Sequence, residues 1–131
     1  MKAFPRASIF MKEHRNLTEV LTDHELASLG DAYINFVYSL ALSIRNRQPS
    51  GKKVKGIALA EALRKAGLRE LMPSRMTSHK LADAAEALLV YAWFSDCITL
   101  EESVTALEKA SELVAGLVQL LEKAKSRIRL S

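Results

Sequence analysis

Apolar residues recur every three to four positions along most of the chain, and no stretch alternates apolar and polar residues as a half-buried strand does. In the last such segment the apolar positions from Val104 to Leu121 fall close to one face of a helix. The pattern predicts an all-α protein, a single bundle of five to six helices. The clearest helices are expected over residues 23–47, 57–66, 78–96 and 100–128.

Residues that cap or break helices stand at the ends of these segments. A threonine followed three residues later by a glutamate is typical of a capping box, in which each side chain accepts from the other residue's backbone N–H group. Proline and glycine are common where a helix stops. On this basis helices begin at Thr22 with Glu25, at Thr77 or Ser78, and at Thr99 with Glu102, and helices end at residues 48–51 and at Gly67.

The segment over residues 26–44 is nearly long enough to span a bilayer. Asp31, Asn35 and several serines in it would face lipid at a high cost in free energy. The other segments are amphipathic and can cover this helix, so a helical bundle is preferred over a transmembrane protein, and no membrane partner is expected.

The composition agrees with one folded domain over residues 1–131. Hydrophobic residues make up 49% of the 131 positions, which excludes a disordered chain. The net charge of +4 is compatible with a polyanionic partner without identifying one. Cys97 is the single cysteine, so no intramolecular disulfide can form. Residues 1–14 lack the long apolar stretch of a secretory signal, and a cytoplasmic location is expected.

Three acidic residues stand in otherwise apolar segments. Asp31 is the only charged residue between positions 26 and 44, and Asp83 and Glu86 are the only charged residues between positions 81 and 95. A buried carboxylate tends to protonate unless a cation compensates its charge. We therefore expect the three to share a divalent cation, and Mg²⁺ favours such ligands. The alternative is that Asp83 and Glu86 form the exposed stripe of a surface helix, because an acid pair at this spacing is common.

Residues 25–32 read ELASLGDA, and residues 83–94 read DAAEALLVYAWF. Two segments of the ribonuclease III catalytic domain have the forms E-x-L-E-F-L-G-D-A and D-x-x-E-A-L-I-G-A-I-Y-L-D, and the chain resembles that family. The helix IALAEALRKAGLREL and the basic loop after it are similar as well. The resemblance covers roughly residues 21–113.

The resemblance implies a helical endonuclease domain that hydrolyses double-stranded or structured RNA and leaves 5′-phosphates. By position, Asp31, Asp83 and Glu86 look like the catalytic residues that bind Mg²⁺, or Mn²⁺ in its place. The family's homodimer places two such sites across one duplex. Ala27 departs from the signature, which has a glutamate four residues before the aspartate. The single-domain branch called Mini-ribonuclease III resembles this chain in having a small residue there.

RNA affinity would have to come from this domain, its dimer or a second protein, because the last predicted helix leaves no room for the double-stranded RNA-binding domain that full-length ribonuclease III carries. Double-stranded RNA is read mainly through its shape, phosphates and 2′-hydroxyl groups. The loop over residues 51–56, GKKVKG, is either such a contact or a solvated connector. The predicted RNA-binding residues are Lys52, Lys53, Lys55, Arg75, His79 and Lys80, with Arg45 and Arg47 as further candidates.

Two other functions compete with an endoribonuclease. The first is a non-catalytic RNA-binding module on a ribonuclease III scaffold, in a ribosomal or RNA-processing particle, and Ala27 motivates it. The second is a helical dimerisation or scaffold protein whose acids are incidental. His79 is either a phosphate-positioning residue or a surface histidine, and no role is predicted for His14 or His24.

Overall fold

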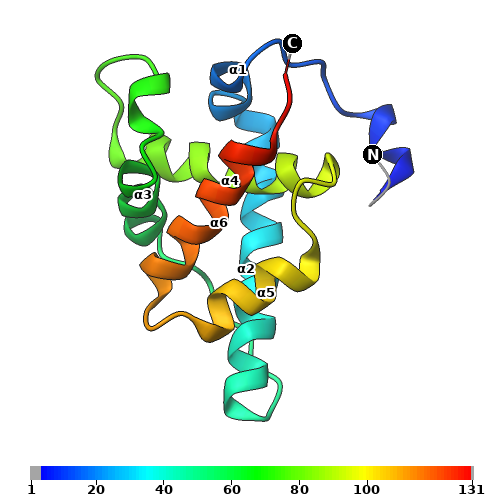
Figure 1. The fold of residues 1–131 in the computed structure, drawn as a ribbon, viewed down its shortest axis with the longest axis vertical. Helices are drawn as coiled ribbons and strands as arrows, with labels where there is room; N and C mark the ends of the chain where they lie inside the picture. Colours follow the sequence, from blue (N-terminus) through cyan, green and yellow to red (C-terminus); the bar gives the residue numbers. More distant parts are fainter. Residues whose placement is uncertain (1–3, 131) are drawn as a thin grey trace.

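The computed structural model describes residues 4–130 and confirms the all-α fold class. Six α-helices and two short 3₁₀ helices follow one another along the described residues, which contain no strand (Figure 1). The elements are η1 (Pro5–Ile9), α1 (Leu17–Leu21), α2 (His24–Asn46), α3 (Gly56–Lys65), η2 (Arg69–Leu71), α4 (Ser78–Phe94), α5 (Leu100–Lys109) and α6 (Leu113–Arg127).

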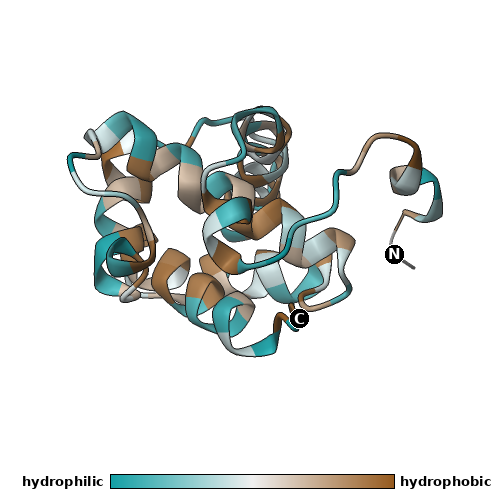
Figure 2. Cartoon of the chain, turned by 90° about the horizontal axis from the view of Figure 1, so that it is seen from above, coloured by the Kyte–Doolittle hydropathy of each residue, from teal (hydrophilic) through white to brown (hydrophobic). Residues whose placement is uncertain are grey.

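Helix α4 forms the centre of the protein. Of its 17 residues 11 are buried, five of them alanines, which let neighbouring helices approach closely. It lies against α1, α2, α3 and α6. Figure 2 shows the apolar segments gathered within the cluster of helices and the connecting loops mostly polar. A helix that is apolar on nearly all sides is stable only when it is surrounded in this way.

Helix α2, the segment weighed as a bilayer span, runs along the long axis of the protein in Figure 1 and packs against α4 and α5. No helix of the described chain is long and apolar enough to cross a membrane. The residues that α2 buries recur at helical spacing: Leu26, Ala27, Gly30, Ile34, Val37 and Ala41.

Most of the predicted helix ends are confirmed to within about two residues. The side chain of Thr77 accepts from the backbone N–H of α4, and Thr99 and Glu102 form the expected capping box of α5. Gly67 follows α3 with a positive φ of 75°, a conformation that favours glycine.

The capping box predicted for Thr22 and Glu25 is wrong. Asp23 caps α2, and its carboxylate accepts a hydrogen bond from a backbone N–H of the first turn. Thr22 instead follows α1, and its hydroxyl donates to the carbonyl of Thr18 at 2.8 Å. The physical reason is that the short helix α1 ends where the cap of α2 was expected, so the threonine hydroxyl bonds to α1 instead.

One continuous helix over residues 100–128 is also wrong, because the chain leaves α5 at Ala110, with φ −70° and ψ 150°, before α6 begins. Arg45 of α2 holds this end of α5. Its Nε donates to the carbonyl of Glu108 at 2.9 Å, and its Nη2 donates to the carbonyl of Ala110 at 2.7 Å. Carbonyls at a helix end have no partner within the helix, so this arginine satisfies them from a neighbouring element.

Helices α2 and α4 approach very closely at Gly30. A Cβ atom at this position would overlap the backbone carbonyl of Glu86, so only glycine permits the contact. The next residue along α2 is Asp31, which the contact brings beside Glu86. The glycine therefore sets the distance between two acids that are 55 positions apart in the sequence.

We predict that Gly30→Ala lowers the free energy of unfolding by about 2–3 kcal/mol or more, because backbone of α4 would have to move. Gly51→Ala is the matched control, since nothing lies within 4 Å of a Cβ atom there. Urea unfolding followed by circular dichroism measures both variants. Equal stability of the two variants would contradict the close contact.

Candidate functional site

Asp31 and Glu86, which we call the acid pair, lie together where α2 crosses α4. Glu86 is only 7% exposed, although it is a carboxylic acid, and Asp31 is half-buried. The two carboxyl groups are close enough to share a hydrogen bond. The structure therefore brings together two of the three acids predicted to form the site.

Burial of the Glu86 carboxyl group raises its pKa from 4.5 to about 8, and the hydrogen bond and negative charge of Asp31 add to the effect. Asp83 raises this pKa further, and Lys53 lowers it. At neutral pH the acid pair consequently holds a proton unless a cation takes its place.

Asn35 fixes the orientation of Asp31. It lies one helical turn further along α2, and its Nδ2 donates to Asp31 Oδ1 at 3.0 Å. Its Oδ1 accepts from the backbone N–H of Val54 at 2.7 Å. One oxygen of Asp31 is thus held towards the helix that carries it.

Asp83 lies one turn before Glu86 on α4, between two histidines. Its Oδ2 is 3.7 Å from His24 Nδ1 and 3.8 Å from His79 Nε2. Both imidazoles are exposed, with 73% and 87% of their side-chain surface open to solvent. Either imidazole, if protonated, would place a positive charge near Asp83 while remaining exposed to solvent.

These groups line a single pocket, the acidic pocket, between α2, the start of α3 and α4. Ala27, which stands where the signature has a glutamate, also lines this pocket. Its lining residues are His24, Ala27, Ser28, Asp31, Lys53, Val54, Gly56, Leu59, His79, Ala82, Asp83 and Glu86.

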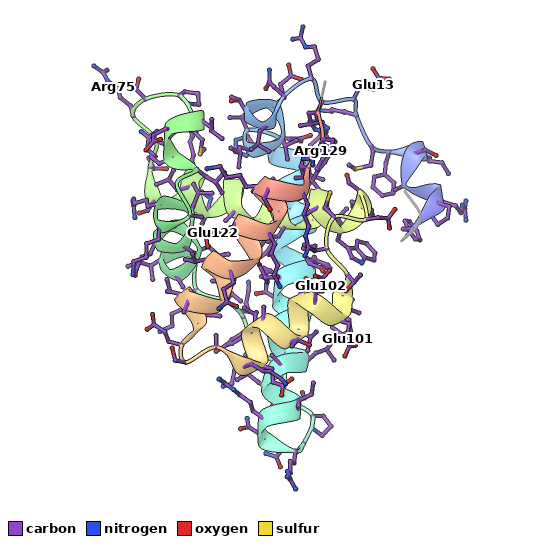
Figure 3. All side chains as sticks on the ribbon, viewed as in Figure 1. Glu13, Arg75, Glu101, Glu102, Glu122 and Arg129 are labelled. Atoms are coloured by element: carbon purple, nitrogen blue, oxygen red, sulfur yellow. The ribbon has the colours of Figure 1, made fainter. Side chains whose placement is uncertain are left out.

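A second pocket, the basic pocket, adjoins the first and shares His24 and Asp83 with it. Arg75 and Lys80 contribute its positive charge, and the carboxylates of Asp23 and Asp83 line it as well. Arg75 has a positive φ of 61° and, in Figure 3, its side chain projects outward from the loop before α4. Anionic groups bound in the acidic pocket would therefore have cations at its edge.

The predicted RNA-binding residues fall into three places. Lys53 and His79 line the acidic pocket, and Arg75 and Lys80 line the basic pocket. Lys52 and Lys55 are exposed on the loop before α3. Sequence reasoning missed His24, whose only signal was its place in the first turn of the helix that carries Asp31.

The acid pair is the set of carboxyl groups that could hold a divalent ion. Among residues 4–130, no group of three or more acids, histidines or cysteines is arranged to hold a metal ion. Mg²⁺ is commonly bound through only one or two carboxylates, with waters completing its shell, and the acid pair supplies two. Two adjacent carboxyl groups that otherwise share a proton fit such an ion.

The fold and this site define a class: an all-helical protein with a pair of carboxyl groups in an open pocket that has a basic edge. A family model described as Ribonuclease III matches residues 24–128, so the chain belongs to the ribonuclease III family. This family comprises RNA endonucleases that act on double-stranded RNA and generally use divalent metals. A search of the curated proteins finds no match.

We predict that Glu86→Gln stabilises the metal-free protein at alkaline pH. A buried acid with a raised pKa favours its protonated form in the folded state, so the free energy of unfolding falls as pH rises from about 4.5 through about 8. Glutamine removes that loss, with a gain on the order of 1–3 kcal/mol at pH 8.5 and little at pH 4.5. Urea unfolding in EDTA at both pH values measures it.

Glu122→Gln is the matched control, because Glu122 is exposed on α6 (Figure 3). Its effect should be small and independent of pH. If Glu86→Gln is no more stable relative to the wild type at pH 8.5 than at pH 4.5, burial does not keep the Glu86 carboxyl group protonated.

Proposed function

We propose that the protein is a Mg²⁺-dependent endoribonuclease that hydrolyses phosphodiester bonds of double-stranded or structured RNA and leaves 5′-phosphates. Membership of the ribonuclease III family supports the reaction class. The observation that carries the proposal is the acid pair, because the buried Glu86 carboxyl group beside the half-buried Asp31 is favourable only with a proton or a bound cation.

In this proposal Asp31 and Glu86 are the principal metal ligands, and Asp83 assists directly or through water. The ion, when bound, supplies charge neutralisation and an activated water for attack on phosphorus. Asn35 keeps one Asp31 oxygen oriented, which preserves the geometry of the ligand. Ala27 leaves the site with one carboxylate fewer than the family signature, so Asp31, Asp83 and Glu86 would have to suffice.

RNA affinity is proposed to come from the basic residues around the two pockets. Arg75 and Lys80, which line the basic pocket, would bind phosphates next to the one in the acidic pocket. His79 lies in the acidic pocket beside Asp83 and would add a further contact to the RNA. On the side of α3, the RNA strand would be contacted by Lys52, Lys53 and Lys55. This arrangement suits recognition by phosphate contacts rather than by base sequence.

A homodimer is part of the proposal. Leu29, Phe36 and Ile44 lie along one stripe of α2 and are 39%, 55% and 52% exposed. Large apolar side chains aligned on one exposed face are typical of a surface that a partner covers. A second copy of this chain is the partner that the family resemblance favours.

The second candidate function is a non-catalytic RNA-binding module on the same scaffold. Ala27 and the lack of a three-ligand metal group within residues 4–130 favour it. Such a protein would bind double-stranded RNA without cutting it.

We predict that the protein cuts labelled double-stranded RNA in Mg²⁺ and not in EDTA, and that Glu86→Gln lowers the rate by on the order of 100-fold or more, since a metal ligand is lost. Glu122→Gln should cut like the wild type. RNA that is bound but not cut by the wild type would favour the binding module, and an active Glu86→Gln variant would overturn the mechanism.

A further inference from the structure

One face of α2 carries a ladder of three polar side chains that hold the loop before α3. Asn35 accepts from the backbone N–H of Val54 at 2.7 Å. Ser39 accepts from the N–H of Lys52 at 2.9 Å and donates to the carbonyl of the same residue at 3.0 Å. The third position is Ser43, which accepts from the N–H of Ser50 at 2.9 Å.

The spacing of this ladder has a simple geometric basis. Its three helix positions are four residues apart, a rise of about 6 Å per step. Its three loop positions are two residues apart, a length of about 6.6 Å in extended chain. The two repeats therefore match within about 1 Å over both steps, and the loop runs antiparallel to α2 from its C-terminal end back to Asp31.

The ladder ends at the acidic pocket, and it fixes the residue between its last two rungs. That residue is Lys53, which lines the pocket together with Asp31 and Glu86. Lys52 is equally exposed but lies on a rung of the ladder, so the two neighbouring lysines occupy different positions.

We propose that Lys53 is a residue of the active site, whose ammonium group balances the charge of the acid pair and contacts the phosphate that is cleaved. Asn35, Ser39 and Ser43 are positioning residues that hold this lysine through the loop backbone. The phosphate contact rests on the proposed function, whereas the balance of charge and the ladder do not.

Amide hydrogen exchange tests the ladder. Ser39→Ala removes the acceptor of the Lys52 amide, so this amide should exchange about tenfold faster or more. Ser39→Thr keeps the hydroxyl and should restore slow exchange. Ser126→Ala on α6 is the matched control and should leave the Lys52 amide unchanged. Slow exchange in Ser39→Ala would overturn the positioning role.

Calorimetric titration with Mn²⁺ tests the lysine. Lys53→Ala removes a cation next to the acid pair, so Mn²⁺ should bind about threefold tighter or more. The control Lys52→Ala removes the same charge one position away and should change the affinity by less than about twofold. With saturating Mn²⁺ and RNA, Lys53→Ala should cut about tenfold slower than Lys52→Ala, since a phosphate contact is lost.

The outcomes separate this inference from the proposed function. A wild type that cuts RNA while the two lysine variants behave alike would overturn the role of Lys53 and leave the nuclease intact. A wild type that does not cut RNA overturns the proposed function, while the shift in Mn²⁺ affinity still decides whether Lys53 faces the acid pair. If the wild type binds no Mn²⁺, the proposed role of Lys53 in the acidic pocket is overturned as well.

Discussion

The contact between α2 and α4 at Gly30 is the constraint on which the site depends. A helix backbone meets another backbone this closely only where no Cβ intervenes. The contact places Asp31 next to Glu86, whose carboxyl group loses water through burial. The same crossing therefore stabilises the fold through packing and destabilises it through charge. Such a conflict between packing and charge is expected at a functional site, where residues are placed for their chemistry at some cost in stability.

The charges around the acid pair show how that conflict is limited. Asp83 lies beside two exposed histidines at the same pocket, and its negative charge still raises the pKa of Glu86. Lys53 is the one lysine that lines the acidic pocket, and it acts against the raised pKa of Glu86. The divalent ion of the proposed function would carry more charge than the lysine and approach more closely, so it would neutralise the acid pair more fully.

Much of the fold could be predicted because the features that indicate it lie in short stretches of the sequence or in single residues. The periodicity of α2 and the cap at Thr99 are local, and the isolation of Asp31 in an apolar helix marks a site without any tertiary information. The break at Ala110 could not be predicted, since the carbonyl there is bound by Arg45, which lies 65 residues earlier in the chain.

The functional site was predicted only in part, because some of its features depend on how distant segments pack together. Asp31, Asp83 and Glu86 all line the acidic pocket, but their unequal burial depends on how α4 is covered. Ser39 and Ser43 look unremarkable in a helix, where serine is common on exposed faces. Their role depends on a loop that folds back along α2, and that loop contains no periodic signal of its own.

The central claim is that the acid pair binds a divalent cation. A crystal grown without metal, soaked in Mn²⁺ and measured at the manganese absorption edge tests it most directly. The account predicts an anomalous difference peak between the carboxylates of Asp31 and Glu86, at about 2.0–2.4 Å from their oxygens. A soaked crystal with no peak there, and with the two carboxyl groups still hydrogen-bonded to each other, would contradict it.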